Sequence, residues 1–220
     1  MNHWLDIKQT LPTDVQLVAV SKYHSAEQIA EVYASGCRDF CESRVQELQA
    51  KQAVLPKDIR WHFIGHLQTN KVRDLLRLRP FLIQSVDSEH LLRAINSEAD
   101  KQGIIQDILL ELHVAREETK SGLTPAEFNL LLPAISNRQY PNIRICGIMA
   151  MATNTDDNVE IRRCFSEAAS LTRDLRLWNE EQTAVGQRHT AILSMGMSDD
   201  YQIAVSEGSN MVRIGSAIFD

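Results

Sequence analysis

The chain has 220 residues, of which 44% are hydrophobic and 24% charged, and it carries a formal net charge of −6. This length can bury one sizeable hydrophobic core, which predicts a single domain spanning residues 1–220. The acidic balance, without basic clusters interleaved with aromatic residues, argues against nucleic acid as a partner, and no apolar run approaches the roughly 20 residues that cross a membrane.

A short β-rich run, a few polar or small residues and then a helical segment recur about eight times along the chain. The predicted strands, in chain order, cover residues 16–22, 38–42, 60–65, 81–87, 108–114, 143–149, 190–195 and 211–215. Such alternation predicts a parallel sheet, either doubly wound or closed into a barrel. Eight units within 220 residues favour the barrel, and the SKYHS stretch after the first strand lacks the glycines of a nucleotide-binding loop. The expected fold is therefore α/β, a single (β/α)8 TIM barrel.

Capping signals mark where several helices begin and end. Ser25 with Gln28, and Thr124 with Glu127, form capping boxes, and Pro125 occupies the first helical position of the second. Left-handed C-terminal caps are predicted where glycine follows a periodic segment, at Gly36 and Gly103.

The longest predicted helix covers residues 156–179. Apolar residues repeat in it about every 3.6 positions, which indicates one face packed on the core. The expected core stripe comprises Val159, Cys164 or Phe165, Ala168, Leu171, Leu175 and Trp178.

The N-terminal stretch MNHWLDIKQT shows neither a signal peptide nor an Arg-rich transit pattern, so a cytoplasmic location is expected. The cysteines show no CxxC spacing and no histidine neighbours at metal spacing; they are Cys37, Cys41, Cys146 and Cys164. Free thiols are therefore predicted, with neither a disulfide nor a metal site. A monomer is the default expectation.

In a barrel of this kind the C-terminal ends of the strands open into one common mouth, so residues far apart in sequence meet there. The residues at these ends are Lys22, Glu42 with Ser43, Gly65 with His66, Asp87, His113, Met149, the run Ser194-Met195-Gly196 and the run Arg213-Ile214-Gly215-Ser216. They place a polar rim on apolar strands, and we expect the functional site at this rim.

Lys22 ends the first predicted strand, LVAVSK, and is the leading candidate for chemistry. An apolar barrel mouth destabilises an ammonium, and the resulting amine can form a Schiff base with an aldehyde. A lysine that only extends from the strand end into water is the alternative interpretation. The position alone does not decide between the two.

Two loops containing glycine and serine, LSMGMSDD and VRIGSAIFD, follow the seventh and eighth strands. In TIM barrels these loops often build a phosphate site from backbone N–H groups. Either loop alone is compatible with an ordinary turn, but together with Lys22 they indicate a phosphorylated aldehyde, and pyridoxal 5′-phosphate combines those two groups. The candidate contacts are the glycines and hydroxyls Gly196, Gly215, Ser194, Ser198 and Ser216.

Five segments resemble the signatures of the YggS/PROSC family of pyridoxal phosphate homeostasis proteins, in the same order and over nearly the whole chain: VAVSK, WHFIGHLQTNK, EETKSGL, LSMGMSDD and MVRIGSAIF. The resemblance implies a barrel similar to the N-terminal domain of alanine racemase. It also implies pyridoxal 5′-phosphate held as a Schiff base on Lys22, with its phosphate against Ser194, Met195, Gly215 and Ser216.

The resemblance further implies that Arg213, in VRIG, faces the pyridine nitrogen. A guanidinium is always protonated and can only donate hydrogen bonds, so it favours an unprotonated ring nitrogen. Such a ring is a weak electron sink, which suits a carrier or a restricted enzyme better than a transaminase.

The sequence departs from the family pattern in two places. Relatives usually have Gly-Glu-Asn after the second strand, whereas this chain has Cys41-Glu42-Ser43, which puts the cofactor contact at Ser43 in question. The chain also stops at Asp220, soon after SAIF. An incomplete last helix and an incomplete barrel closure are therefore expected.

Other residues are weaker candidates. His66 is a possible mouth contact or a structural histidine, and Asp87 is an equally good cap for the helix that opens at Ser88. The NKVRDLLRLR stretch is most simply a solvated helix face, with docking of client apoenzymes as a minor alternative. Possible acid or base groups are Glu111, His113 and Lys120.

Three hypotheses follow. The first is a carrier that buffers pyridoxal 5′-phosphate and releases it to apoenzymes, with no catalytic residue assigned. The second is an amino-acid racemase or a related enzyme, which would need an acid or base on each face of the substrate α-carbon. The third is a Schiff-base aldolase that acts on sugar phosphates without a bound cofactor. The carrier is favoured.

Overall fold

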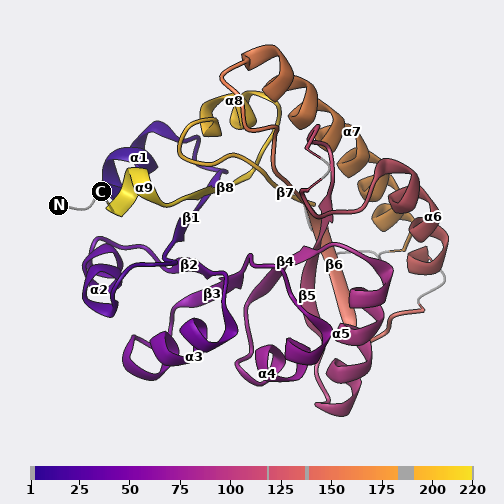
Figure 1. The fold of residues 1–220 in the computed structure, drawn as a ribbon, viewed down its shortest axis with the longest axis horizontal. Coiled ribbons are helices and arrows are strands. Elements are labelled where there is room, and N and C mark those ends of the chain that lie inside the picture. Colours follow the sequence, from indigo (N-terminus) through magenta and orange to yellow (C-terminus); the bar gives the residue numbers. More distant parts are fainter. Residues whose placement is uncertain (1–2, 118, 137–138, 183–190, 220) are drawn as a thin grey trace.

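The computed structural model describes residues 3–117, 119–136, 139–182 and 191–219, with side chains given for all of these except 136 and 174–182. Within these residues eight parallel strands close into a barrel in chain order, each neighbour hydrogen-bonded to the next (Figure 1). The strands are β1 (Gln16–Val20), β2 (Asp39–Glu42), β3 (Arg60–Phe63), β4 (Leu82–Val86), β5 (Gln106–Leu112), β6 (Ile143–Ala150), β7 (Ile192–Ser194) and β8 (Met211–Ile214).

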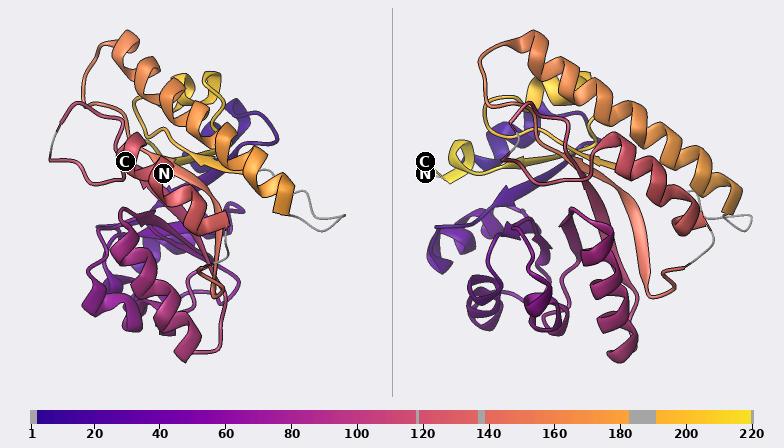
Figure 2. Two further views of the ribbon diagram at one scale, coloured as in Figure 1. Left: turned by 90° about the vertical axis from the view of Figure 1, so that its right-hand side faces the viewer. Right: turned by 45° about the vertical axis from the view of Figure 1, so that its right-hand side comes forward.

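Helices surround this barrel. They are α1 (Trp4–Thr10), α2 (Ala26–Ala34), α3 (Val45–Val54), the short 3-10 turn η1 (Thr69–Lys71), α4 (Val72–Arg77), α5 (Glu89–Lys101), α6 (Pro125–Ser136), α7 (Asn158–Gln182), α8 (Tyr201–Ser206) and α9 (Ser216–Phe219). Figure 2 shows α7 running beside α6 along the outside of the barrel. In the described part of the chain, no helix combines the length and apolar character that crossing a bilayer requires.

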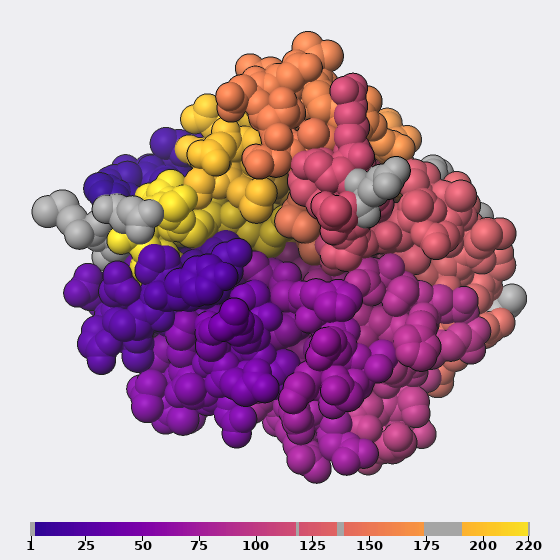
Figure 3. All heavy atoms as spheres, in the orientation of Figure 1, coloured from indigo at the N-terminus to yellow at the C-terminus, as the bar shows by residue number. Residues whose placement is uncertain are grey.

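The predicted barrel is confirmed, and each predicted strand overlaps an observed one. The expectation of incomplete closure is wrong, because β8 pairs with β1 from Gln16↔Met211 to Ala19↔Ile214 and also pairs with β7. The helix α9 that follows is four residues long. Ile218 in α9 is fully buried, and its carbonyl accepts a 3.0 Å hydrogen bond from the backbone of His3, so the yellow and indigo ends of the chain adjoin in Figure 3.

The two predicted capping boxes are present where α2 and α6 begin. The Ser25 hydroxyl accepts from the Gln28 N–H at 3.3 Å, and the Thr124 hydroxyl accepts from the Glu127 N–H at 3.2 Å. Both boxes are closed by the reciprocal side-chain acceptor. At α5 the cap is the Ser88 hydroxyl, which accepts from Leu91, rather than Asp87. The predicted C-terminal glycines have positive φ, +108° at Gly36 and +61° at Gly103.

The long helix α7 packs on the core, but its apolar stripe begins later than predicted. Val159 is 76% exposed, whereas the buried face starts at Ile161. Two residues turn an α-helix by roughly 200°, so Val159 points to the opposite side. The buried apolar residues are Ile161, Cys164, Phe165, Ala168 and Leu171. Leu175 and Trp178 lie outside the residues whose side chains are described.

The core has two parts. A large apolar cluster fills the space between the barrel and the helices. A smaller cluster comes from alternate strand positions that face the barrel interior: Val18, Cys41, Leu82, Leu109, Met149 and Met211. Since side chains alternate along a strand, the same inward rows also contain polar residues two positions away. These polar residues build the site described next.

Candidate functional site

Lys22 follows β1 by two residues, and the backbone beside it is held by Ser21. The Ser21 N–H donates to the carbonyl of Cys41 at 3.0 Å, and its hydroxyl donates to Glu42 Oε1 at 2.6 Å. The ammonium of Lys51, on α3, donates to the Ser21 carbonyl at 2.9 Å. The backbone beside Lys22 is therefore fixed to β2 and α3.

The side chain of Lys22 is partly buried. Among the described residues, its Nζ has neither a hydrogen-bond acceptor nor an ion-pair partner, and it lies 5.8 Å from the ring centroid of Tyr23. Tyr23 itself is exposed and has a φ of +72°, which turns the chain sharply after the lysine. The amine is thus available at the strand end where the sequence predicts it.

Glu42 does not lie on the rim as expected. Cys41 faces the barrel interior, so Glu42 faces outward, where its Oε1 accepts from Lys51 Nζ at 2.6 Å. Glu42 is fully buried, and its Oε2 has no hydrogen-bond partner within the described part of the chain. Burial raises the pKa of Glu42, while hydrogen bonds from Lys51 and Ser21 act in the opposite direction. This cluster supports the backbone of Lys22 from outside the barrel.

Arg213, on β8, lies inside the barrel with 3% exposure. Its Nη1 donates to the carbonyl and the hydroxyl of Ser194 at 2.7 and 2.6 Å, and its Nη2 donates to the Ala150 carbonyl at 3.1 Å. Burial lowers the pKa of Arg213 from its ordinary value, yet a guanidinium remains protonated and can only donate. A fixed donor therefore stands in the barrel interior.

The strand register places Lys22 and Arg213 at the same end of the barrel. β1 and β8 pair in parallel up to Ala19↔Ile214; Arg213 directly precedes Ile214, and Lys22 follows β1 by two residues. Burial raises the pKa of the fully buried Cys41 thiol, and the nearby cations of Arg213 and Lys22 both lower it.

The loops after β7 and β8 meet. The Ser216 hydroxyl donates to the Ser198 hydroxyl at 3.0 Å, and the Ala217 N–H approaches the same oxygen at 3.5 Å. A Cβ on Gly215 would lie 3.2 Å from the Cβ of Val20, two residues before Lys22. Gly196 has a φ of +98°, and a Cβ there would lie 2.7 Å from Ala204 Cβ, so only glycine fits. Gly215 thus brings the loop after β8 close to the end of β1, and the contact between Ser216 and Ser198 joins the loop after β7 to it.

Two predicted phosphate contacts have other partners in this structure. The Ser194 hydroxyl is fully buried, accepts from Arg213 and donates to Gln84 Oε1 at 2.7 Å. Met195 is fully buried in the large apolar cluster, and its N–H donates to the Met211 carbonyl. Ser198 and Ser216 instead present their hydroxyls at the loop surface.

Ser43 and His66 come from neighbouring strand ends. A Cβ on Gly65 would lie 1.9 Å from the Ser43 carbonyl oxygen, so the backbones after β2 and β3 touch. The His66 side chain is 67% exposed, and its Nδ1 lies 3.2 Å from Asp87 Oδ2. Both residues therefore lie at the rim beyond β2 and β3.

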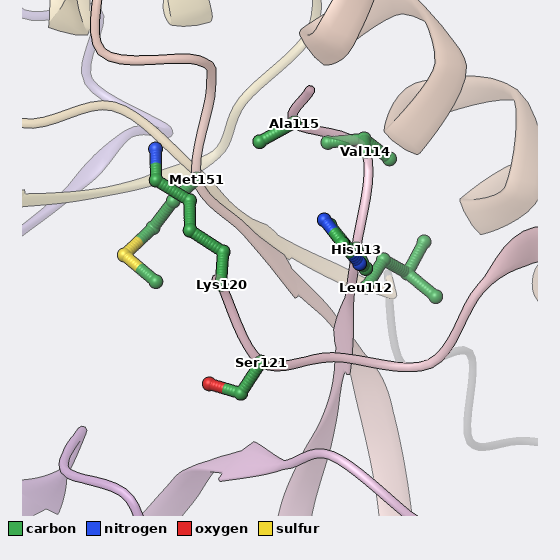
Figure 4. Close-up of a pocket in the computed structure, with 7 residues that line it drawn as sticks. All are labelled: Leu112, His113, Val114, Ala115, Lys120, Ser121 and Met151. Atoms are coloured by element: carbon green, nitrogen blue, oxygen red, sulfur yellow. The ribbon is translucent and has the colours of Figure 1, made fainter. Parts of the chain in front are cut away.

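Two of the acid and base candidates near β5, His113 and Lys120, line a recess (Figure 4). Lys120 Nζ donates to the Ala152 carbonyl at 2.5 Å and pairs with Glu117 at 3.1 Å, while His113 faces it across the recess. Glu111 is buried and accepts from Ser121 at 3.2 Å. Burial, and then the charge of Asp87, raise the pKa of Glu111. Unlike Lys22, Lys120 has its ammonium fully engaged.

Three polar residues inside the barrel were not singled out from the sequence: Asp39, His62 and Gln84. All three are buried and hydrogen-bonded in a row. The sequence does contain a pattern that could have indicated them, because each is a polar residue within a mostly apolar strand, in DFCE, WHF and LIQSV. The four cysteines are thiols, and no group of three metal-ligating side chains occurs in the described ranges.

A closed parallel barrel with a free lysine after its first strand and a buried arginine on its last defines the class of alanine racemase-like barrels. The model of the family described as "Alanine racemase, N-terminal domain" matches residues 1–220. The chain belongs to this family and, within it, to the pyridoxal phosphate homeostasis proteins, as the sequence resemblance predicted.

The curated relatives agree over most of their length. The chain is 36% identical over 206 residues to the pyridoxal phosphate homeostasis protein of Helicobacter pylori, which covers 93% of this chain and 87% of that protein. It is 35% identical over 218 residues to the human protein of the same name, with 93% and 75% covered.

The solved structures extend the comparison to the fold. PipY of Synechococcus elongatus, solved without PLP, is 35% identical, with a TM-score of 0.89 over 98% of this chain and 97% of that one. The same protein with PLP bound has a TM-score of 0.86. An alanine racemase of Clostridium difficile, 17% identical with a TM-score of 0.72, shares the fold over 54% of its own length.

Proposed function

We propose that the protein binds pyridoxal 5′-phosphate through the Lys22 amine and serves its homeostasis, storing and supplying the cofactor without strong catalytic turnover. The carrying observation is the partner-free amine of Lys22 beside a backbone that Ser21 fixes, with the buried donor Arg213 at the same end of the barrel. Relatives at 36% and 35% identity bear the name pyridoxal phosphate homeostasis protein, and PipY was solved with PLP bound. These similarities support the same cargo here.

The residues fit this cofactor. When bound, it supplies a reactive aldehyde and a pyridine ring that can withdraw electrons. The Lys22 amine would condense with the aldehyde carbon and release one water. Ser198 and Ser216, with the backbone at Gly196 and Gly215, would receive the phosphate, because small residues leave their amides accessible. Ser43 and His66 remain candidate contacts at the rim.

Arg213 decides what kind of chemistry the site favours. A donor-only group that meets the pyridine nitrogen would favour its unprotonated form, and the ring would then be a weaker electron sink. The side chain therefore favours retention and release over carbanion chemistry. We propose Ser194 as the residue that holds Arg213 rather than as a direct phosphate donor.

The test begins with the near-visible absorbance of protein incubated with pyridoxal 5′-phosphate. We expect a band that disappears in Lys22→Ala and persists in Lys120→Ala, a matched lysine near the mouth. Reduction with borohydride and peptide mass analysis should place the adduct on Lys22. Colourless protein, or an adduct that maps to Lys120, would contradict the proposal, and a band on Lys22 would exclude the cofactor-free aldolase.

Transfer to clients is a further part of this proposal. Protein loaded with cofactor should restore activity to an apoenzyme that depends on pyridoxal 5′-phosphate, at a rate set by release from Lys22. A loaded protein that never activates an added apoenzyme would contradict the supply role. The monomeric state and the cytoplasmic location expected from the sequence stay predictions.

A further inference from the structure

Side chains from five strands form a continuous row of hydrogen bonds through the barrel interior. Arg213 Nη1 lies 2.6 Å from Ser194 Oγ, which lies 2.7 Å from Gln84 Oε1. Gln84 Nε2 lies 3.0 Å from His62 Nδ1, and His62 Nε2 lies 3.2 Å from Asp39 Oδ1. Each of these side chains is at least nine-tenths buried. We call this row the relay.

The direction of the relay is fixed by its two ends. Arg213 can only donate, so the Ser194 oxygen accepts and its own proton goes to Gln84 Oε1. The Gln84 amide then donates to His62 Nδ1, which must be unprotonated. His62 donates from Nε2 to the carboxylate of Asp39, which can only accept. With the Gln84 amide oriented as in the structure, the donors and acceptors of the row are mutually consistent when His62 accepts at Nδ1 and donates from Nε2.

Asp39 is a stable terminus. Burial alone would raise its pKa, but hydrogen bonds from Arg60 and His62 lower the pKa to about 2, so the carboxylate stays ionised. Asp39 and Arg60 also line a recess of about 350 Å³ at the opposite end of the barrel from Lys22. The relay thus runs from the N-terminal end of the strands to the guanidinium at the mouth.

Stability alone is a poor reason for this arrangement. Burying polar groups costs free energy unless every donor and acceptor is satisfied, and apolar side chains of similar volume often do at least as well. The neighbouring inward positions are indeed apolar, as at Val18, Leu82 and Leu109. The relay instead orients the Ser194 hydroxyl: its proton goes to Gln84, and its oxygen accepts the hydrogen bond from Arg213.

We propose that Asp39, His62, Gln84 and Ser194 are positioning residues that hold the Arg213 guanidinium in one orientation toward the cofactor ring. This inference rests on the proposed function, because it assigns a purpose to the arginine of that site. Gln84 is its central member, since the Gln84 amide both accepts from Ser194 and donates to His62.

The test compares Gln84→Leu with Gln106→Leu. Gln106 is also a buried strand glutamine, but its amide donates to the carbonyls of Pro80 and Asp107. We expect the dissociation constant of pyridoxal 5′-phosphate to rise about tenfold in Gln84→Leu, as for one buried hydrogen bond, and to stay within about twofold in Gln106→Leu. Unchanged affinity in Gln84→Leu would overturn the proposal.

A double-mutant cycle shows whether Gln84 acts through Arg213. In an Arg213→Leu background, Gln84→Leu should cause no further loss of affinity. A second tenfold loss would mean that Gln84 acts by another route and would overturn the assignment. These outcomes differ from failure of the proposed function, which would show as the absence of any adduct on Lys22.

The cofactor-free protein gives an independent readout. Nitrogen-15 NMR should show His62 with a proton on Nε2 and none on Nδ1, and the opposite tautomer would overturn the relay. Gln84→Glu is the second variant, for the case that Gln84→Leu fails to fold, because glutamate keeps the shape of the glutamine side chain. Its carboxylate cannot donate a hydrogen bond. His62 should then become protonated at Nδ1, and an unaltered Nδ1 signal there would count equally against the proposal.

Discussion

Lys51 Nζ is hydrogen-bonded to the carbonyl oxygen of Ser21 at 2.9 Å, directly before the lysine of the site. The same ammonium pairs with Glu42, whose Oε1 also accepts from the Ser21 hydroxyl. A lysine on α3 thus supports the backbone from which the reactive amine projects.

Replacing this support should destabilise the protein. Lys51→Met leaves the Glu42 charge buried without its ion-pair partner, with only the Ser21 hydroxyl still bound to it, so the free energy of unfolding should fall by about 3 kcal/mol. Urea unfolding followed by circular dichroism measures this. The double variant Lys51→Met with Glu42→Leu should recover at least half of the loss, and equal instability in the two would argue against the ion pair as the cause.

Acid should weaken the fold partly through Asp39. Its pKa is lowered from 3.8 to about 2 in the folded state, so its contribution is fully present above pH 4 and is lost as the pH falls toward 2. The shift corresponds to about 2 kcal/mol. Unfolding free energies between pH 5 and 2 should therefore decline more steeply in the wild type than in Asp39→Asn, and parallel curves would contradict the assignment.

Gly65 should be intolerant of any side chain. In Gly65→Ala the new Cβ would lie 1.9 Å from the Ser43 carbonyl oxygen, so the backbones after β2 and β3 must separate. We expect a loss of at least about 2 kcal/mol and weaker cofactor binding. Gly103→Ala is the control for a glycine replaced without a steric clash, because no atom lies within 4 Å of its new Cβ; its positive φ of +61° should cost about 1 kcal/mol and leave binding unchanged.

Amino-acid exchange chemistry distinguishes a carrier from a racemase. We expect holoprotein in deuterated water to exchange the α-proton of L-alanine or D-alanine no faster than free pyridoxal 5′-phosphate does, because under the proposed function Arg213 would disfavour protonation of the ring nitrogen. Proton NMR and optical rotation measure this. Rapid exchange, or loss of optical rotation, would favour the racemase alternative.

The strands and caps could be predicted from sequence because their signals are local. β-rich runs and capping boxes such as Ser25 with Gln28 lie within a few residues of the structure they specify. The barrel followed from the repetition of these units. Its closure was misjudged because the pairing of β8 with β1 joins residues nearly 200 positions apart, as in Gln16↔Met211.

The site could be predicted only in part, for a physical reason. The positions of Lys22 and Arg213 near the ends of the first and last strands could be predicted, whereas their contacts with a cofactor stay predictions. The partner of the Ser194 hydroxyl could not be found, since Gln84 is 110 positions away and the choice between a ligand and a buried amide depends on packing. Glu42 was misplaced because the sequence alone does not say which alternate row faces inward.

The hydrogen bonds at Ser21 fix the backbone next to Lys22 but do not involve the Lys22 side chain. The N–H, hydroxyl and carbonyl of Ser21, directly before Lys22, are all hydrogen-bonded, whereas the Lys22 amine has no hydrogen-bond or ion-pair partner among the residues described. Under the proposed function, binding or releasing the cofactor would then require only rotations about a few side-chain bonds, while the backbone stays in place. Loaded and empty protein should give nearly superimposable backbones and similar hydrogen-exchange protection throughout β1.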